Sequence, residues 1–186
     1  MGKLLVGAIL GFLLALPAAA QNSPQAPPKD LSLWLRNSYA ANRKYLARTA
    51  DKMPEEFYGM RPGPQPEVRT FAQLIGHLAN FNFRWCSDAK GEKNPMEATD
   101  FEKLTDKASL VKGLNIALTY CDSAYAMLTD ANSMDFVQGT RDDGTKAPVL
   151  RISRLMSNVA HNNEHYGNLV TYMRIKSIVP PSSEPR

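Results

Sequence analysis

Histidines are rare in this chain of 186 residues, and their spacing suggests chemistry. His161 and His165 stand four residues apart in the stretch HNNEH, whereas His77 lies far away in FAQLIGHLANF. On an α-helix, positions four apart differ by about 40° around the axis, so the first two side chains project side by side. All three histidines fall at the border of an apolar helical stripe. The pattern predicts one site built from three imidazoles on two helices.

Such a site predicts binding of one divalent metal. Neutral imidazole is the commonest metal ligand among side chains, and helical bundles build metal sites from facing helices. Three ligands leave a position open for water or substrate, as in catalytic zinc sites. Nickel, iron and manganese accept the same donors as zinc, so the donor set does not choose among these four metals. The alternative is a structural role, in which each histidine makes a hydrogen bond at the edge of the core.

Five further residues lie near the histidines on the same two helical segments. Asn158, Asn162 and Tyr166 are candidates to orient the ligands or a substrate. Phe81 and Trp85 follow at one and two helical turns on the other segment. Together with Tyr166, they would form an apolar rim suited to a small organic molecule. No residue stands out as a general base.

The stretch HNNEH also matches the H-x-x-E-H pattern of inverted zinc peptidases, in which the glutamate is the general base. Those enzymes need a further acidic ligand well downstream. The only acid after His165 is Glu184, in a proline-rich tail, and Glu164 projects away from the apolar stripe. We therefore interpret Glu164 as a solvent-exposed charge and reject the peptidase.

Four amphipathic segments must position these residues. Their apolar positions recur at helical spacing, and stretches rich in Gly and Pro separate them. Asp30 is the expected N-cap of the first helix, and Thr70 with Gln73 has the spacing of a capping box at the second. The helices are predicted to cover approximately residues 30–53, 70–89, 105–128 and 149–176.

These segments predict an all-α domain, a four-helix bundle with long crossover connections. No strong alternating run indicates a sheet. The stretch DANSMDFVQGTRDDGTKAP is predicted to be an irregular crossover, because Val137 is too isolated to indicate a strand. The bundle is expected over residues 30–179, followed by a flexible tail at 180–186.

The N-terminus has the layout of a secretory signal peptide. Lys3 precedes an apolar run from Leu4 to Leu16, and Ala18–Ala20 follow as a cleavage site, which predicts a signal over residues 1–20. The run is shorter than the roughly 20 residues that span a bilayer, so we expect no stable membrane insertion after cleavage. A proline-rich leader at 21–29 follows. The mature protein is expected to be exported, either periplasmic or extracellular.

Cysteines and charge limit the partners. Cys86 and Cys121 could form one disulfide in an exported protein, or could be two separate buried thiols. The formal charge is +4 and the charged residues are scattered, which argues against nucleic-acid binding. A small-molecule substrate or ligand is the expected partner, and a homodimer is compatible with exposed helix faces.

The stretches TFAQLIGHLANFNFRWCSDAKGEKNP and SRLMSNVAHNNEHYGNLVTYMRIKSIVPPSS resemble the DinB-like (YfiT-related) four-helix metalloproteins. In that family, a histidine on the second helix and an H-x-x-x-H on the last helix hold a divalent metal, which corresponds to His77, His161 and His165 here. The resemblance also implies activities such as thiol-dependent transfer with bacillithiol or mycothiol, or maleylpyruvate isomerisation. Those thiols are cytoplasmic, so predicted export conflicts with thiol transfer but not with the metal site.

Three functions are compatible with these observations. The first is a metal-dependent enzyme, a hydrolase or transferase acting on a small molecule, with hydrolysis conflicting least with export. The second is a non-catalytic bundle that binds a metal or another ligand. The third is a purely structural bundle. Metal content separates the third from the first two, and turnover separates the first from the second.

Overall fold

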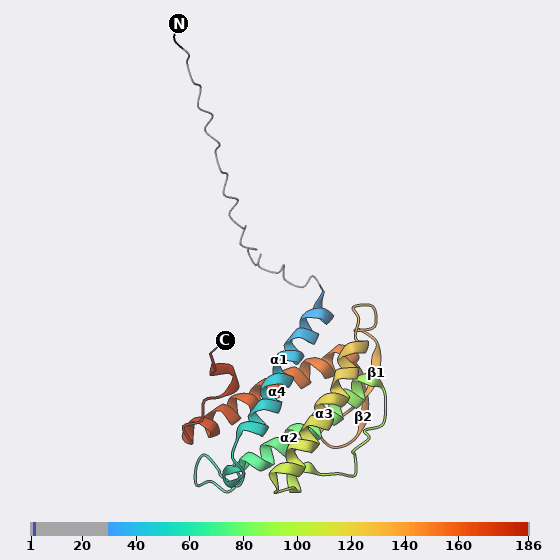
Figure 1. The fold of residues 1–186 in the computed structure, drawn as a ribbon. Coiled ribbons are helices and arrows are strands. Elements are labelled where there is room, and N and C mark those ends of the chain that lie inside the picture. The colour runs from blue at the N-terminus through green and yellow to red at the C-terminus, as the bar shows by residue number, and fades with distance from the viewer. Residues whose placement is uncertain (1, 3–29, 186) are drawn as a thin grey trace.

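The computed structural model describes residue 2 and residues 30–185 of the protein. Apart from residue 2, the predicted signal peptide and leader therefore lie outside the described residues. Four long helices form a bundle (Figure 1), which confirms the predicted fold class. They are α1 (Leu31–Lys52), α2 (Phe71–Lys90), α3 (Lys107–Met127) and α4 (Arg151–Ile175). No helix in the described residues is long and apolar enough to cross a membrane.

Local signals set the helix ends. The Asp30 carboxylate accepts a hydrogen bond from the Leu33 amide at the start of α1. The predicted capping box opens α2, with the Gln73 amide donating to Thr70 Oγ1 at 3.1 Å and the Thr70 amide donating to Gln73 Oε1 at 2.8 Å. Gly91 ends α2 with φ 73°, a left-handed conformation that glycine adopts without steric cost. These caps agree with the sequence-based boundaries.

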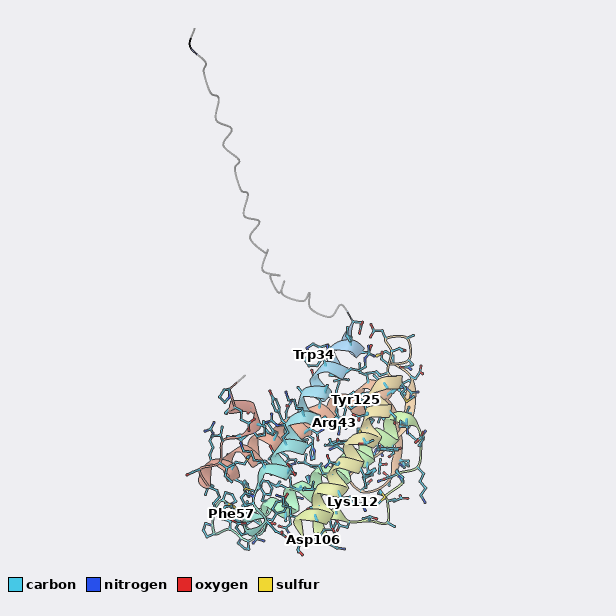
Figure 2. The ribbon with its side chains drawn as sticks, in the orientation of Figure 1. Trp34, Arg43, Phe57, Asp106, Lys112 and Tyr125 are labelled. Atoms are coloured by element: carbon cyan, nitrogen blue, oxygen red, sulfur yellow. A yellow bond between two sulfur atoms is a disulfide. The ribbon has the colours of Figure 1, made fainter. Side chains whose placement is uncertain are left out.

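The helices pack so that α2 contacts both α3 and α4, while α1 packs against the other sides of the same two helices. Trp34 near the start of α1 and Asp106 before α3 lie at opposite ends of the bundle (Figure 2), so these two helices run antiparallel. The core between the helices is aliphatic and aromatic, and its fully buried side chains include Leu35, Leu46, Phe71, Leu78, Leu114, Leu118 and Leu155. This arrangement makes the two histidine-bearing helices neighbours.

The predicted irregular crossover between α3 and α4 is wrong, because it contains a β-hairpin. Strand β1 (Phe136–Thr140) pairs antiparallel with β2 (Lys146–Leu150), and Val137 faces Val149 in the register. The Arg141 amide donates to the Thr145 carbonyl at 2.8 Å across the turn, where Gly144 has φ 83°. Each strand has only five residues, which is too short for an alternating pattern to reveal it.

Part of the segment predicted to be a flexible tail, residues 180–186, packs against the helices in the described residues. A short 3₁₀ turn, η3 (Pro181–Ser183), packs on the bundle, and Pro181 is buried. Glu184 accepts from Lys52 Nζ at 2.6 Å and also pairs with Arg48. Two cations on α1 thus hold the end of the chain against the helices, a long-range contact that composition alone could not reveal.

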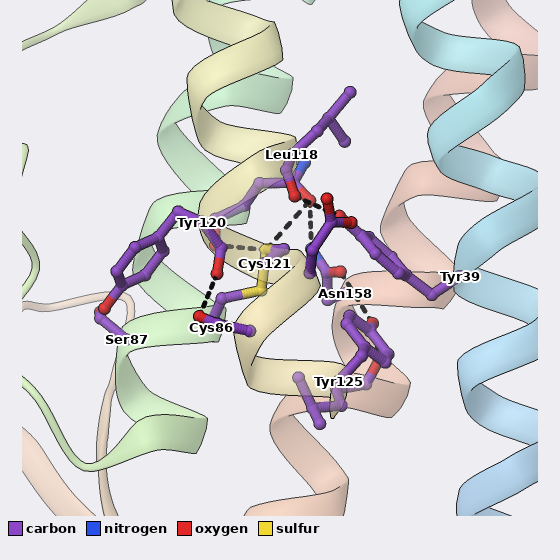
Figure 3. The surroundings of a disulfide bond; sticks show 12 residues. Tyr39, Cys86, Ser87, Leu118, Tyr120, Cys121, Tyr125 and Asn158 are labelled. Atoms are coloured by element: carbon purple, nitrogen blue, oxygen red, sulfur yellow. Dashed lines mark hydrogen bonds between the residues drawn. A yellow bond between two sulfur atoms is a disulfide. The ribbon is translucent and has the colours of Figure 1, made fainter. Parts of the chain in front are cut away.

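Cys86 and Cys121 form a disulfide, which decides between the two alternatives left open by the sequence. Their Cα atoms are 5.3 Å apart, within the range of disulfides, and both residues are fully buried. Figure 3 shows the bridge between α2 and α3, in surroundings that include Tyr125 and Asn158. The bond fixes the position of α2, which carries His77, relative to α3.

We expect loss of this disulfide to destabilise the bundle by about 2–4 kcal/mol, because the bridge closes a loop in the unfolded chain. Urea unfolding of the oxidised protein, the reduced protein and the Cys86→Ala/Cys121→Ala variant measures the effect. Reductant should lower the midpoint of the wild type and leave that of the double variant unchanged. Equal midpoints for oxidised and reduced wild type would contradict the expected contribution.

Candidate metal centre

The structure brings the three histidines together on the facing sides of α2 and α4. His77 Nε2 lies 3.0 Å from His161 Nε2, which lies 3.0 Å from His165 Nε2. One possible ligand atom from each residue falls within 4.8 Å of the other two. His77 and His165 are buried, while His161 is half-buried. Of the three rings, His161 is therefore the most exposed to solvent.

The geometry fits a metal centre. Ligand nitrogens about 2.1 Å from a divalent ion lie roughly 3.0–3.4 Å from one another, close to the spacing observed. His77 Nδ1 is 2.5 Å from Glu102 Oε1. Because a carboxylate only accepts, Nδ1 carries the proton and the Nε2 lone pair of His77 points at the other two rings. His165 Nδ1 is 3.2 Å from the Asn168 side-chain nitrogen. Metal binding through His165 Nε2 requires the Asn168 amide to turn its oxygen toward this position, so that it accepts from a protonated Nδ1.

Burial keeps two of the rings neutral. Together with the neighbouring His165 and His77, it lowers the pKa of His161 to about 3. Burial also lowers the pKa of His165, again with a contribution from His77. Unprotonated imidazoles at neutral pH are the form that binds a metal, so desolvation prepares the site for a cation.

Glu102 is a site residue that sequence reasoning missed. It lies on the short turn η2 (Phe101–Lys103), and its second oxygen accepts from Arg69 Nε at 2.9 Å. Burial alone would raise the pKa of Glu102, but hydrogen bonds from His77 and Arg69 outweigh it and hold the pKa below its usual value. The carboxylate is therefore ionised and orients the His77 ring, as carboxylates commonly do for metal-bound histidines.

Gly76 allows Glu102 to reach His77. A Cβ at position 76 would lie 2.3 Å from the Phe101 carbonyl oxygen, which is far too close for contact with backbone. The absence of a side chain lets η2 lie directly against α2. The only local signal of this contact in the sequence is the glycine next to His77 on an apolar helix face. It indicates that another segment packs closely there, but it does not identify η2 or Glu102.

Phe81 and Trp85 occupy the expected places beside the histidines. The Phe81 ring centroid lies 4.5 Å from that of His77 and 4.8 Å from that of His161. The Trp85 ring meets His161 edge-on at 4.7 Å. Tyr166 is placed elsewhere: its ring stacks on Tyr45 at 5.2 Å, and its hydroxyl accepts from the Ser182 amide. The aromatic rim is thus built mainly by α2.

Asn158 and Asn162 belong to a buried hydrogen-bond network and, among the residues described, do not contact the histidine rings through hydrogen bonds. Asn82 donates to Asn162 Oδ1 at 3.0 Å and accepts from Asn158 Nδ2 at 2.9 Å, while Tyr125 donates to Asn158 Oδ1 at 2.8 Å. In the described residues neither asparagine bonds to a histidine. All three asparagines are buried. Their hydrogen bonds tie α2 to α4 next to the histidines and so act on the site indirectly.

Two cavities flank the centre. One of about 390 Å³ touches His165 and is lined by charged and polar groups, including Arg69, Glu164 and Asn168. Glu164 is exposed, as the sequence predicts. The other, about 950 Å³, lies between α2, the loop after it and the hairpin, and includes Phe81 and Arg84 but no histidine. The smaller cavity is therefore the one in direct contact with the ligand set.

The chain belongs to the DinB superfamily, whose family model matches residues 38–169. This match confirms the resemblance drawn from the sequence. Among proteins of curated function, no sequence matches the chain.

Solved structures share the fold. A DinB-like protein from Bacillus cereus has a TM-score of 0.62 at 18% identity, covering 79% of this chain and 93% of its own. A DinB-like protein from Bacillus subtilis has a TM-score of 0.60 at 19% identity, covering 82% and 99%. A mycothiol-dependent maleylpyruvate isomerase has a TM-score of 0.56 at 14% identity, covering 74% and 60%. At these identities the likeness shows the fold alone.

We expect Glu102→Gln to weaken zinc binding about 10- to 100-fold, because the ring of His77 loses its charged partner. A competition titration against a chromophoric chelator measures the affinity. Glu97→Gln is the matched control, since Glu97 is exposed and pairs only with Lys93 in the described residues. Equal zinc affinities for the two variants would show that Glu102 does not support the site.

Proposed function

We propose that the protein binds one divalent metal through His77, His161 and His165 and uses it to hydrolyse a small molecule. The observation that carries the proposal is the convergence of three Nε2 atoms, with the opposite nitrogens of two rings held by Glu102 and Asn168. A purely structural role would need no such convergence, since each histidine could be satisfied separately.

Different residues of the site would bind the metal, orient its ligands and contact the substrate. The histidines supply three nitrogen donors, and Glu102 with Asn168 fixes two of the rings. When bound, a divalent metal supplies Lewis acidity and lowers the pKa of water to near neutral. Phe81 and Trp85 shield His161 and offer an apolar surface to a substrate. The cavity at His165 gives a small molecule access from solvent.

Hydrolysis is preferred over thiol transfer because of the compartment. We propose that residues 1–20 act as a signal peptide and that the mature chain, beginning at Gln21, is exported. The Cys86–Cys121 disulfide supports this proposal, because such bonds persist in oxidising compartments. A thiol co-substrate suits a reducing cytoplasm, whereas water is available everywhere.

We expect the mature protein, purified without a histidine tag, to hold about one equivalent of metal by inductively coupled plasma mass spectrometry. His161→Ala should lose it, while Asn163→Ala, exposed on the same helix, should retain it. The metal identified is then used to screen esters, amides and phosphoesters for turnover.

Turnover that His165→Ala abolishes, with its circular dichroism unchanged, would establish the enzyme. Metal binding without turnover on any of these bonds would instead support the alternative of a non-catalytic metal-binding bundle. No metal after reloading with zinc, nickel, iron and manganese would overturn the site itself.

We expect the full chain, expressed in a secreting bacterial host, to appear outside the cytoplasm with Gln21 as its first residue. N-terminal sequencing and intact mass of the fractionated protein measure this. Replacing Leu10 and Leu13 with Asp interrupts the apolar run and should leave the protein uncleaved in the cytoplasm. Full-length wild-type protein in the cytoplasmic fraction would contradict export.

A further inference from the structure

Two arginines occupy matching positions on the histidine-bearing helices. Arg84 follows His77 by seven residues on α2, and Arg154 precedes His161 by seven residues on α4. Seven residues make about two turns, or roughly 10 Å, and return to nearly the same face of a helix. Each arginine therefore lies on the same face of its helix as a histidine.

The two helices are antiparallel, so both arginines lie at the same end. His77 meets His161 at one level, and Arg151 donates to the Ala89 carbonyl further along. Both guanidinium groups also meet consecutive residues of β1. Arg84 Nη2 donates to the Thr140 carbonyl at 2.8 Å, and a Cβ on Gly139 would lie 2.8 Å from Arg154 Nε. We call Arg84 and Arg154 the arginine pair.

The charge of the arginine pair is poorly compensated. In the described residues, Arg154 forms no ion pair with a carboxylate, and its buried Nε has no hydrogen-bond partner. The Nε of Arg84 is likewise buried and unpartnered. The acid at Arg84 is Asp142, 3.1 Å away, whose side chain is wholly exposed, so this pair contributes little. The Asp88 carboxylate accepts hydrogen bonds from Thr140 and Lys146 and forms no ion pair with either arginine in the described residues.

Unsatisfied polar atoms concentrate along this face. The described residues contain four buried side-chain nitrogen or oxygen atoms without a partner: Arg84 Nε, Arg154 Nε, His161 Nδ1 and Thr49 Oγ1. Three of the four belong to the arginine pair or to the histidine cluster. Because buried polar groups in folded proteins are nearly always paired, such a concentration points to a ligand.

An aromatic surface connects the two ends. The Phe81 ring lies 5.3 Å from the Arg84 guanidinium carbon and 5.0 Å from the Trp85 ring. Both rings also contact His161. A flat apolar group could rest against them, with one end at the arginine pair and the other at the histidines.

We propose that the arginine pair binds the negatively charged group of the site's ligand. The ligand class is a small organic anion, a carboxylate or a phosphate ester, with a flat apolar body against Phe81 and Trp85. Its reactive end lies at the histidines. This inference rests on the proposed function for what happens at that reactive end, but anion binding itself is independent of the metal.

Three probes of one ring size test the charge preference: benzoate, phenyl phosphate and neutral benzamide. Their dissociation constants are measured by calorimetry on the mature protein, both zinc-loaded and metal-free. Trp34→Phe leaves Trp85 as the only tryptophan, so its emission reports whether the ring binds there. We expect at least one anion to bind roughly tenfold or more tightly than benzamide in both forms, and to change Trp85 emission. The preferred anion identifies the carboxylate or the phosphate.

Arg154→Gln should abolish the preference for anions without changing zinc affinity. Arg174→Gln is the matched control, because Arg174 is exposed near the other end of α4 and should leave every constant unchanged. If Arg154→Gln lowers the melting temperature, Arg154→Lys keeps the charge and should weaken anion binding while preserving the preference over benzamide.

Equal binding of anions and benzamide by the wild type, or a preference that survives Arg154→Gln, would overturn the inference. A preference that vanishes when zinc is removed would place the anion on the metal, which overturns the inference and leaves the proposed function intact. If the protein binds no zinc but still prefers anions through Arg154, the inference of an anion site stands. Only the proposed metal site is then overturned.

Discussion

The packing of α2 against α4 is the constraint on which the site depends. Neither helix contains a complete ligand set, because His77 comes from one and the pair of histidines from the other. The two helices must therefore keep one register and one separation. The buried hydrogen bonds of Asn82 with Asn158 and Asn162 supply this, since a shift would leave buried amide groups unpaired at a cost of about 1–3 kcal/mol each.

Other contacts hold α2 from its remaining sides. The Cys86–Cys121 disulfide ties it to α3, and the buried carboxylate of Asp88 accepts from the Thr140 amide and hydroxyl of the hairpin. The turn η2 lies against Gly76. The helix that carries His77 is thus positioned before any ligand binds, which is the condition for a preorganised site.

The sequence predicts the histidine trio because all three residues obey helical periodicity, a local rule. It cannot predict Glu102, which reaches His77 from a turn 25 positions away only because Gly76 has no side chain. The hairpin cannot be predicted because its strands are short. Without the hairpin, the sequence does not indicate that Arg84 and Arg154 meet the same strand. Tyr166 follows His165 directly, and one residue rotates a side chain by about 100° around the helix axis. Its ring therefore lies on another face of α4, against Tyr45.

Charge balance connects the two ends of this face. Three imidazole ligands bring no negative charge to a cation, and the carboxylate of Glu102 is already shared with Arg69. A divalent ion held there would keep most of its charge in a half-buried setting, where an unpaired charge is costly. The arginine pair adds two more positive groups about two turns away. An anion is therefore the ligand that this face of the bundle lacks, since the buried carboxylate of Asp88 on it already accepts from Thr140 and Lys146.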